Sequence, residues 1–177
     1  MDAVETVMQN DGYAQLSARK IAQSAGLNYQ LVFYYFGSVE ELLVQTYRRR
    51  TERLFEQYRQ ALQSARPFHA LWKLSTVRTD GVLSIEYMAM SNHYASIRQE
   101  SIRHVQRILT EMENSLPADI KIETLGDGFE LSSVTLAFLI SSVGNYTSFQ
   151  QAQGISKESD KIGQLLTKMI DLFDSSL

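Results

Sequence analysis

The segment from Leu16 to Phe36 limits most strongly what this chain can fold into, because a glycine interrupts an otherwise helical pattern near its middle. Ser17 is a suitable N-cap for a helix over residues 18–25, in which apolar side chains recur every three or four positions. Gly26 permits the positive φ that a sharp reversal requires, and Asn28 can cap a second helix. The segment therefore predicts two short helices joined by a tight turn.

Two helices in this arrangement form a helix-turn-helix, whose second helix enters the major groove of DNA. Gln30 carries the amide needed for a bidentate contact with adenine, and Arg19 carries the guanidinium that pairs with guanine. The alternative is a small helical bundle whose exposed tyrosines serve another purpose. The side chains expected to close the core between the two helices are Leu27, Val32, Phe33 and Phe36.

A succession of motifs fills the first quarter of the chain: Gly12-Tyr13, Ser17 to Ala22, Ala25 to Leu27, Phe33 to Phe36 and Glu40 to Leu43. Together they resemble the N-terminal domain of the TetR (tetracycline-repressor) family of transcription regulators. The resemblance implies that Ser17 and Arg19 contact phosphate and base. It also implies that Tyr29, Gln30 and Leu31 read bases and that Tyr34 and Tyr35 contact the DNA backbone. Asn28, at the start of the second helix, is included among the expected DNA-binding residues.

Two features depart from the family pattern. Family members commonly carry a lysine where this chain has Val39, and a basic arm before the first helix. The segment from Tyr13 to Val39 contains Arg19 and Lys20 as its only charged residues. Each neutralised phosphate adds to both affinity and salt dependence. We therefore expect a shallower salt dependence than for a strongly basic DNA-binding protein, or further natural residues before Met1.

The rest of the sequence predicts an all-α fold of about nine helices, since helical spacing recurs throughout and the chain has only two prolines. We predict a three-helix DNA-binding domain over residues 1–46 and an effector-binding and dimerisation domain over residues 47–177. A long helix from Ser38 to Arg66 would join them, with Ser38 and Glu41 as its capping box. The arginines 48–50 would lie on its solvated face.

Two further expectations concern the second half of the chain. Residues 117–128 are expected to form a loop, followed by a nearly uncharged helix from Phe129 to Phe149 and a last helix from Ser156 to Leu177. Both helices are apolar over more than one face, which a partner chain could cover in a four-helix bundle. The resemblance implies such a homodimer, whereas the residues alone would also suit a monomeric core. The expected interface residues are Val134, Phe138, Ser142, Leu165, Met169 and Phe173.

A small-molecule pocket is expected in the same domain, because TetR-type proteins generally enclose an effector cavity there. Aromatic, sulfur-containing and occasional polar side chains are typical of such cavities, although ordinary core is the alternative for each of them. Few charges among them suggest a largely apolar ligand. The expected lining residues are Trp72, Tyr87, Met90, His93, Tyr94, Phe138 and Tyr146.

No catalytic, metal or cofactor site is predicted. The chain has no cysteine, and His93 and His104 would lie roughly 16 Å apart on one helix, too far to share an ion. No nucleophile motif or phosphate-binding glycine loop occurs, so an enzyme is not expected. No stretch approaches the roughly 18 apolar residues of a membrane span, and we expect a cytoplasmic protein without membrane contact.

The sequence thus favours a ligand-responsive transcription regulator, and specifically a repressor. It would bind a palindromic operator in double-stranded DNA as a homodimer and be released by a small-molecule effector. The alternative is a helical dimer that binds a small molecule or a partner and has weakened or lost specific DNA binding.

Overall fold

The computed structural model describes residues 1–76, 81–121, 130–155 and 157–175, and their regular structure is almost entirely helical. The helices of these residues are α1 (Asp2–Asp11), α2 (Ala18–Ala25), α3 (Gln30–Phe36), α4 (Val39–Leu62), α5 (Pro67–Thr76), α6 (Gly81–His93), α7 (Ala95–Ser115), α8 (Ser133–Ala152) and α9 (Lys157–Asp174). A short 3₁₀ turn, η1 (Tyr13–Gln15), precedes α2. The all-α prediction with about nine helices is confirmed over the described residues.

The chain divides into two compact units. The first contains residues 1–54 and 82–105, and the second contains residues 55–81 and 106–177. The first unit thus includes most of α6 and half of α7, which the division at residue 46 assigned to the second domain. The functional division between DNA binding and effector binding stays a prediction.

The core of the first unit joins α1, α2 and α3 to the beginning of α4 and to α6. Tyr47 of α4 and Tyr87 of α6 are buried against each other, with ring centres 4.8 Å apart. Burial raises the pKa of both phenols, because it disfavours the charged form. The buried apolar residues of this core are Val4, Met8, Ala18, Ile21, Val32, Leu42, Leu43, Val44, Tyr47, Leu83, Tyr87, Met90 and Ile97.

Of the three arginines expected on the solvated face of α4, Arg48 is exposed, Arg49 is half-buried and Arg50 is buried. Arg48 donates to the Glu100 carboxylate at 2.6 Å, and this hydrogen bond is the main reason why the pKa of Glu100 lies below its ordinary value. Arg49 pairs with Asp2 of α1. Arg50 is buried, because the helical period turns its side chain toward the core of the unit. The apolar periodicity of the sequence did not indicate this burial, since arginine is not an apolar residue.

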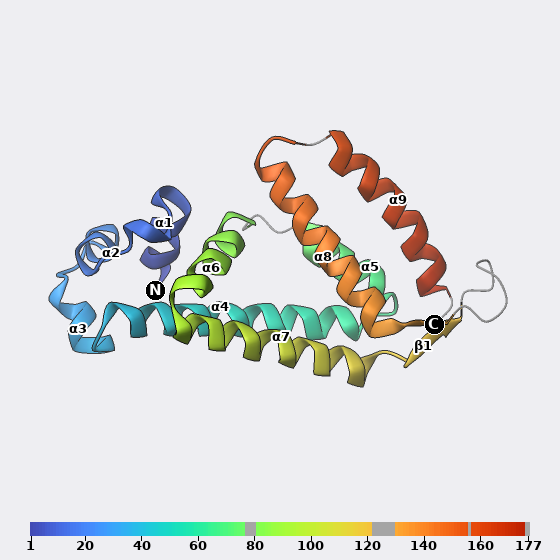
Figure 1. The fold of residues 1–177 in the computed structure, drawn as a ribbon, viewed down its shortest axis with the longest axis horizontal. Helices are drawn as coiled ribbons and strands as arrows, with labels where there is room; N and C mark the ends of the chain where they lie inside the picture. The colour runs from blue at the N-terminus through green and yellow to red at the C-terminus, as the bar shows by residue number, and fades with distance from the viewer. Residues whose placement is uncertain (77–80, 122–129, 156, 176–177) are drawn as a thin grey trace. The chain divides into compact units, whose positions relative to one another are not determined.

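In the second unit, α5 packs against both α8 and α9 (Figure 1). The approach of α5 to α8 is close because Gly144 of α8 faces Ser75 of α5: a Cβ atom built on Gly144 would lie 2.5 Å from the Ser75 Cβ. The buried apolar residues of this core are Tyr58, Ala61, Leu62, Phe68, Leu71, Trp72, Met112, Leu116, Ile120, Leu136, Ala137, Ile140, Ile170 and Phe173.

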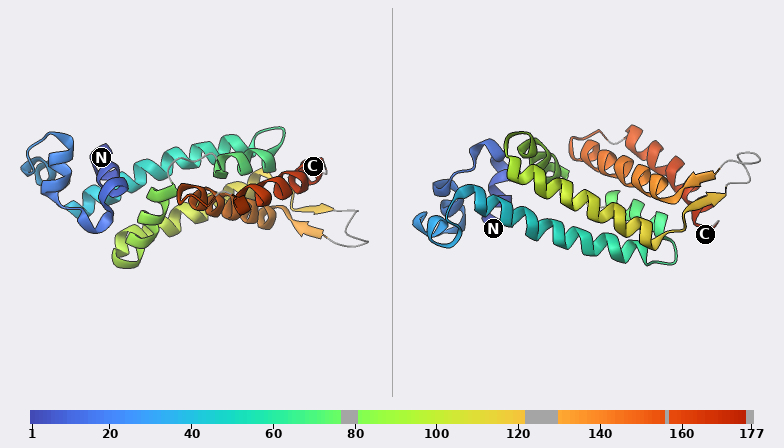
Figure 2. Two further views of the ribbon diagram at one scale, coloured as in Figure 1. Left: turned by 90° about the horizontal axis from the view of Figure 1, so that it is seen from above. Right: turned by 60° about the horizontal axis from the view of Figure 1, so that its bottom comes forward.

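A short antiparallel hairpin joins α7 to α8, where the sequence predicted only a loop followed by a helix from Phe129. Strand β1 (Asp119–Lys121) pairs with β2 (Glu130–Ser132), and the two arrows lie side by side in Figure 2. Helix α8 therefore begins at Ser133, with the Ser132 hydroxyl accepting from the Thr135 N–H. The turn expected at residues 126–128 lies outside the described residues.

Helix boundaries otherwise follow the predicted caps. The Ser38 hydroxyl accepts from the Glu41 N–H at 3.0 Å, as a capping residue should. Helix α4 ends at Leu62, which is earlier than the predicted Arg66, because Ser64 and the residues around it already form the turn that precedes Pro67.

The start of α5 is capped from a distance by the end of α9. The Asp174 carboxylate accepts from the N–H groups of Phe68 and His69, each at 3.0 Å, and its side chain is almost fully buried. These two donors have no helical acceptor, and a carboxylate at a helix N-terminus also interacts favourably with the helix dipole.

We expect Asp174→Ala to lower the free energy of unfolding of the second unit by about 2 kcal/mol, because two partly buried N–H groups lose their acceptor. Urea denaturation followed by tryptophan fluorescence would measure this change. Asp171→Ala, which removes an exposed partner of Arg66 in the same turn of α9, is the matched control. Equal losses for the two variants would contradict the capping role.

Candidate DNA-binding surface and effector cleft

The helix-turn-helix of the first unit is built by the local signals found in its sequence. The Ser17 hydroxyl accepts from the Lys20 N–H at 3.3 Å and starts α2. Gly26 ends this helix in the left-handed region, at φ 67° and ψ 29°. The Asn28 side chain then accepts from the Gln30 N–H at 2.9 Å at the start of α3. The predicted caps and the predicted turn are present.

The side chains expected at DNA surround these two helices and reach the surface. Tyr34 and Tyr35 are largely exposed, and their rings meet edge to face at 4.9 Å. The Arg19 guanidinium lies 5.5 Å from the centre of the Tyr29 ring, which is a favourable position for a cation above an aromatic ring. Of the eight expected residues, the exposed ones are Ser17, Arg19, Asn28, Tyr29, Gln30, Tyr34 and Tyr35, whereas Leu31 is half-buried.

The positive charge of this surface is small. Lys20 forms an ion pair with Asp11 at 3.2 Å, so one of the two cations between Tyr13 and Val39 is already neutralised. Arg19 has no ion-pair partner among the described residues and is available to DNA.

Two of the four residues predicted for the small core are on the surface instead. The exposed fraction is 60% for Leu27 and 48% for Phe33, whereas Val32 is buried and Phe36 half-buried. Helical spacing cannot distinguish a buried apolar residue from one on an open recognition surface, because α3 spans only 7 residues and packs through little more than Val32. The prediction for Leu27 and Phe33 is therefore wrong, and no other signal in the sequence distinguishes these positions.

Helix α6 contacts the segment that leads into the helix-turn-helix. The Glu86 carboxylate accepts from the Tyr13 N–H at 2.6 Å, directly after Gly12, whose φ is 81°. The His93 ring stacks on the Tyr13 ring with centres 5.9 Å apart. Both contacts fix the entry to α2 from one helix of the same unit.

Comparison with known proteins identifies this N-terminal surface. Residues 1–46 match the family model of bacterial regulatory proteins of the tetR family. The N-terminal segment is therefore a tetR-family DNA-binding domain. The DNA-binding class predicted from the sequence is thereby confirmed for this domain.

Two solved structures share the fold over most of the chain. One is described as a transcriptional regulator from Streptomyces coelicolor A3(2), with 20% identity, a TM-score of 0.65 and 83% of each chain covered. The other is described as a TetR transcription regulator from Haloarcula marismortui ATCC 43049, with 13% identity, a TM-score of 0.67, and 97% of this chain and 94% of that chain covered. None of the curated proteins matches the sequence.

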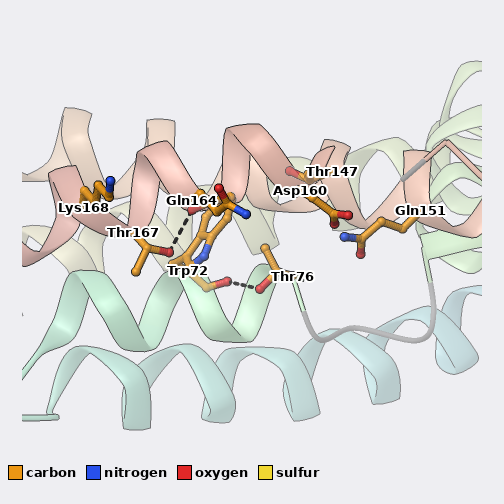
Figure 3. Close-up of a pocket in the computed structure, with 9 residues that line it drawn as sticks. Trp72, Thr76, Thr147, Gln151, Asp160, Gln164, Thr167 and Lys168 are labelled. Carbon is orange, nitrogen blue, oxygen red and sulfur yellow. Dashed lines mark hydrogen bonds between the residues drawn. The ribbon is translucent and has the colours of Figure 1, made fainter. Parts of the chain in front are cut away.

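The second unit contains a cleft of about 730 Å³ between α5, α8 and α9 (Figure 3). Most of its lining residues are of polar types, and Trp72 is the one aromatic residue among them. The indole of Trp72 packs between two helices at glycines, since built Cβ atoms on Gly144 and Gly163 would lie 3.4 Å and 3.7 Å from it. The lining residues are Trp72, Thr76, Thr147, Gln151, Asp160, Gly163, Gln164, Thr167 and Lys168.

Of the residues predicted to line an effector cavity, only Trp72 lies in this cleft. Tyr87 and Met90 are buried in the core of the first unit, and Tyr94 packs against that core. His93 is exposed and stacks on Tyr13. Phe138 and Tyr146 point to the surface of α8, with exposed fractions of 51% and 61%. Aromatic content selected these residues, whereas the cleft is lined by threonine, glutamine and charged side chains that the sequence did not single out.

The residues predicted for a dimer interface are mostly exposed. Phe138, Ser142, Leu165 and Met169 face away from the core of the second unit, and Val134 is half-buried. Phe173 differs, because it is buried against Phe68 within its own unit. The large apolar side chains exposed on α8, on α9 and just before α9 are Phe138, Leu139, Tyr146, Ile155, Ile162, Leu165, Met169 and Leu172.

Within the described part of the chain, no cluster of three or more His, Asp or Glu side chains could hold a metal ion. None of the described helices is long and apolar enough to cross a membrane.

Proposed function

We propose that this TetR-family regulator is a repressor that binds a palindromic operator as a homodimer and releases it when a small molecule occupies the second unit. One observation carries the DNA-binding part: the caps and the glycine turn of the helix-turn-helix leave Arg19, Tyr29 and Gln30 together on an open surface. A protein that acts on DNA in this way would work in the cytoplasm.

The recognition surface suggests a role for each kind of side chain. Gln30 would pair with adenine and Arg19 with guanine, since an amide and a guanidinium each match a pair of groups on one base edge. Stacking on Tyr29 restricts the Arg19 side chain, which reduces the entropy it would lose on binding. Leu27 and Phe33 offer exposed apolar surface for deoxyribose and thymine methyl groups, and Tyr34 and Tyr35 offer hydroxyls for phosphates.

The homodimer is proposed because α8 and α9 each expose several large apolar side chains. Leu165, Met169 and Leu172 recur along one side of α9, and Phe138, Leu139 and Tyr146 along one side of α8. Monomeric proteins rarely leave such surfaces uncovered. A two-fold dimer through these helices would place one helix-turn-helix on each half of a palindrome.

We expect Leu165→Asp to convert the dimer into a monomer at micromolar concentration, because it introduces a charge at a highly exposed apolar position. Sedimentation equilibrium would measure the mass. Gln164→Asp, the neighbouring substitution on α9 outside this apolar side, is the matched control and should leave the mass unchanged. A monomeric wild-type protein would contradict the proposed dimer.

Release by an effector follows if the ligand binds more tightly to a dimer whose recognition helices do not fit the operator. The affinity for DNA then falls by the factor by which the ligand discriminates between the two states. The expectation of a largely apolar effector depended on aromatic residues that lie elsewhere, and the cleft between α5, α8 and α9 is the effector site that we propose in their place.

Selection of random duplex DNA on the purified protein, at low and at moderate salt, tests this function. We expect enrichment of an inverted repeat whose half-sites are about one helical turn apart. Absence of enrichment at both salt concentrations would contradict the proposal and favour a dimer that has lost specific DNA binding.

A further inference from the structure

One side of α9 forms the polar wall of the cleft in the second unit. The residues of this wall are Asp160, Gln164, Thr167 and Lys168. Gln164 is four residues from both Asp160 and Lys168, and Thr167 is three residues after Gln164, so the four lie on one face of the helix. The exposed apolar residues of α9 are centred on another side of the helix, and Lys168 lies at the border between the two sides, because it is three residues after Leu165 and four before Leu172. Figure 3 shows the wall facing α5, with Trp72 between them.

Three threonines supply hydrogen-bond acceptors to the cleft. Thr76, Thr147 and Thr167 each donate their hydroxyl hydrogen to the backbone carbonyl four residues earlier in their own helix. A hydroxyl has one hydrogen and two lone pairs, so these groups can only accept from a further molecule. The cleft therefore suits a ligand with several N–H or O–H donors.

Two opposite charges lie at the two ends of this wall. Asp160 and Lys168 are eight residues apart on one helix, a rise of about 12 Å. Neither side chain has an ion-pair partner among the described residues, and both are exposed. In Figure 3 they lie on opposite sides of Trp72 along α9. An amine would be attracted to the Asp160 end and a carboxylate to the Lys168 end.

We propose that the cleft binds a short amphoteric molecule of peptide-like chemistry, with an amine at Asp160, a carboxylate at Lys168 and N–H groups that donate to the threonine hydroxyls. An extended tripeptide spans about 10 Å, which fits the distance between the two charges when their side chains lean inward. The volume of about 730 Å³ is within the range of small-molecule sites. This inference depends on the proposed effector function, and it specifies the class of effector.

The single tryptophan of the chain makes the test direct, since Trp72 lines the cleft and is the only indole. We would titrate the full-length protein with triglycine, triglycine amide and N-acetyltriglycine, and follow the Trp72 emission and its indole N–H resonance. Triglycine carries both charges, the amide only the cation and the acetylated peptide only the anion. We expect triglycine to bind about tenfold more tightly than either analogue, because each charged group is worth at least one charge-assisted hydrogen bond.

Two variants assign the charges to their ends. Asp160→Asn should remove the preference for triglycine over N-acetyltriglycine, and Lys168→Gln should remove the preference over triglycine amide. Lys161→Gln, which removes an exposed charge of the same helix outside the cleft, should change neither preference. Equal binding of all three peptides, no response of Trp72, or preferences that survive both cleft variants would each overturn the proposal.

The result can be separated from that of the operator selection. A Trp72 response with the expected preferences, in a protein that selects no DNA sequence, would retain the amphoteric site and reject the repressor. An enriched operator together with a silent Trp72 would retain the DNA-binding function and reject the amphoteric ligand.

Discussion

Gly144→Val is expected to lower the free energy of unfolding of the second unit by about 3 kcal/mol. The Cβ of any residue at position 144 would lie 2.5 Å from the Ser75 Cβ and 3.4 Å from Trp72 Cε3, closer than the helix backbones allow without moving apart. Separation of α5 from α8 would disturb the most extensive helix contact of this unit. Denaturation followed by Trp72 fluorescence would measure the loss, since the indole is next to the altered position.

Two further variants test whether the close approach is the cause. Asn145→Val, at the exposed neighbour of Gly144, should change stability by less than about 0.5 kcal/mol. Ser75→Gly removes the atom that a new Cβ would meet, so it should partly rescue Gly144→Ala in a double-mutant cycle. Strictly additive effects of these two substitutions would show that the two helices do not meet at this point.

Arg50→Met is expected to lower the free energy of unfolding of the first unit by about 3 kcal/mol, because it leaves a largely buried carboxylate without its buried partner. The Arg50 side chain is 8% exposed and lies 3.8 Å from a Glu5 oxygen, whose side chain is 16% exposed. The guanidinium also lies 5.7 Å from the centre of the Tyr87 ring. Hydrogen exchange of the α1 amides would report the loss, because Glu5 is on that helix.

The chain provides a control on the same carboxylate. Arg53 also lies 3.8 Å from Glu5, but its side chain is 60% exposed, so Arg53→Met should cost less than about 1 kcal/mol. Adding Glu5→Gln to Arg50→Met should recover part of the loss, because the uncompensated charge is then removed. Equal effects of the two arginine substitutions would contradict the importance of burial.

Features set by a few neighbouring residues were predictable from the sequence. Ser17 and Ser38 begin their helices as hydrogen-bond acceptors, and Gly26 adopts the left-handed conformation that the turn needs. These are local interactions within three or four residues, so composition and spacing determine them. The recognition of the N-terminal family depends on the same segment.

Features that depend on which elements meet in space were not predictable. Apolar spacing predicted Phe33 in a small core, but α3 is too short to enclose this side chain. The charge of Arg50 predicted a position in solvent, whereas residues of α1 and α6 cover its side chain. The sequence shows that α8 contains small residues, but it does not show that Gly144 meets Ser75, because that contact depends on tertiary packing. The cleft was missed because its lining combines polar residues from three helices, each ordinary on its own helix.

The most direct test of the DNA-recognition surface is to repeat the operator selection with Gln30→Ala and with Arg19→Ala. If these side chains read base edges, each variant should lose the preference for one base pair at symmetric positions of both half-sites, at a cost of about 1–3 kcal/mol, while the rest of the inverted repeat is retained. A consensus unchanged in both variants, with unchanged affinity, would contradict the assignment of α2 and α3 as the DNA-reading element.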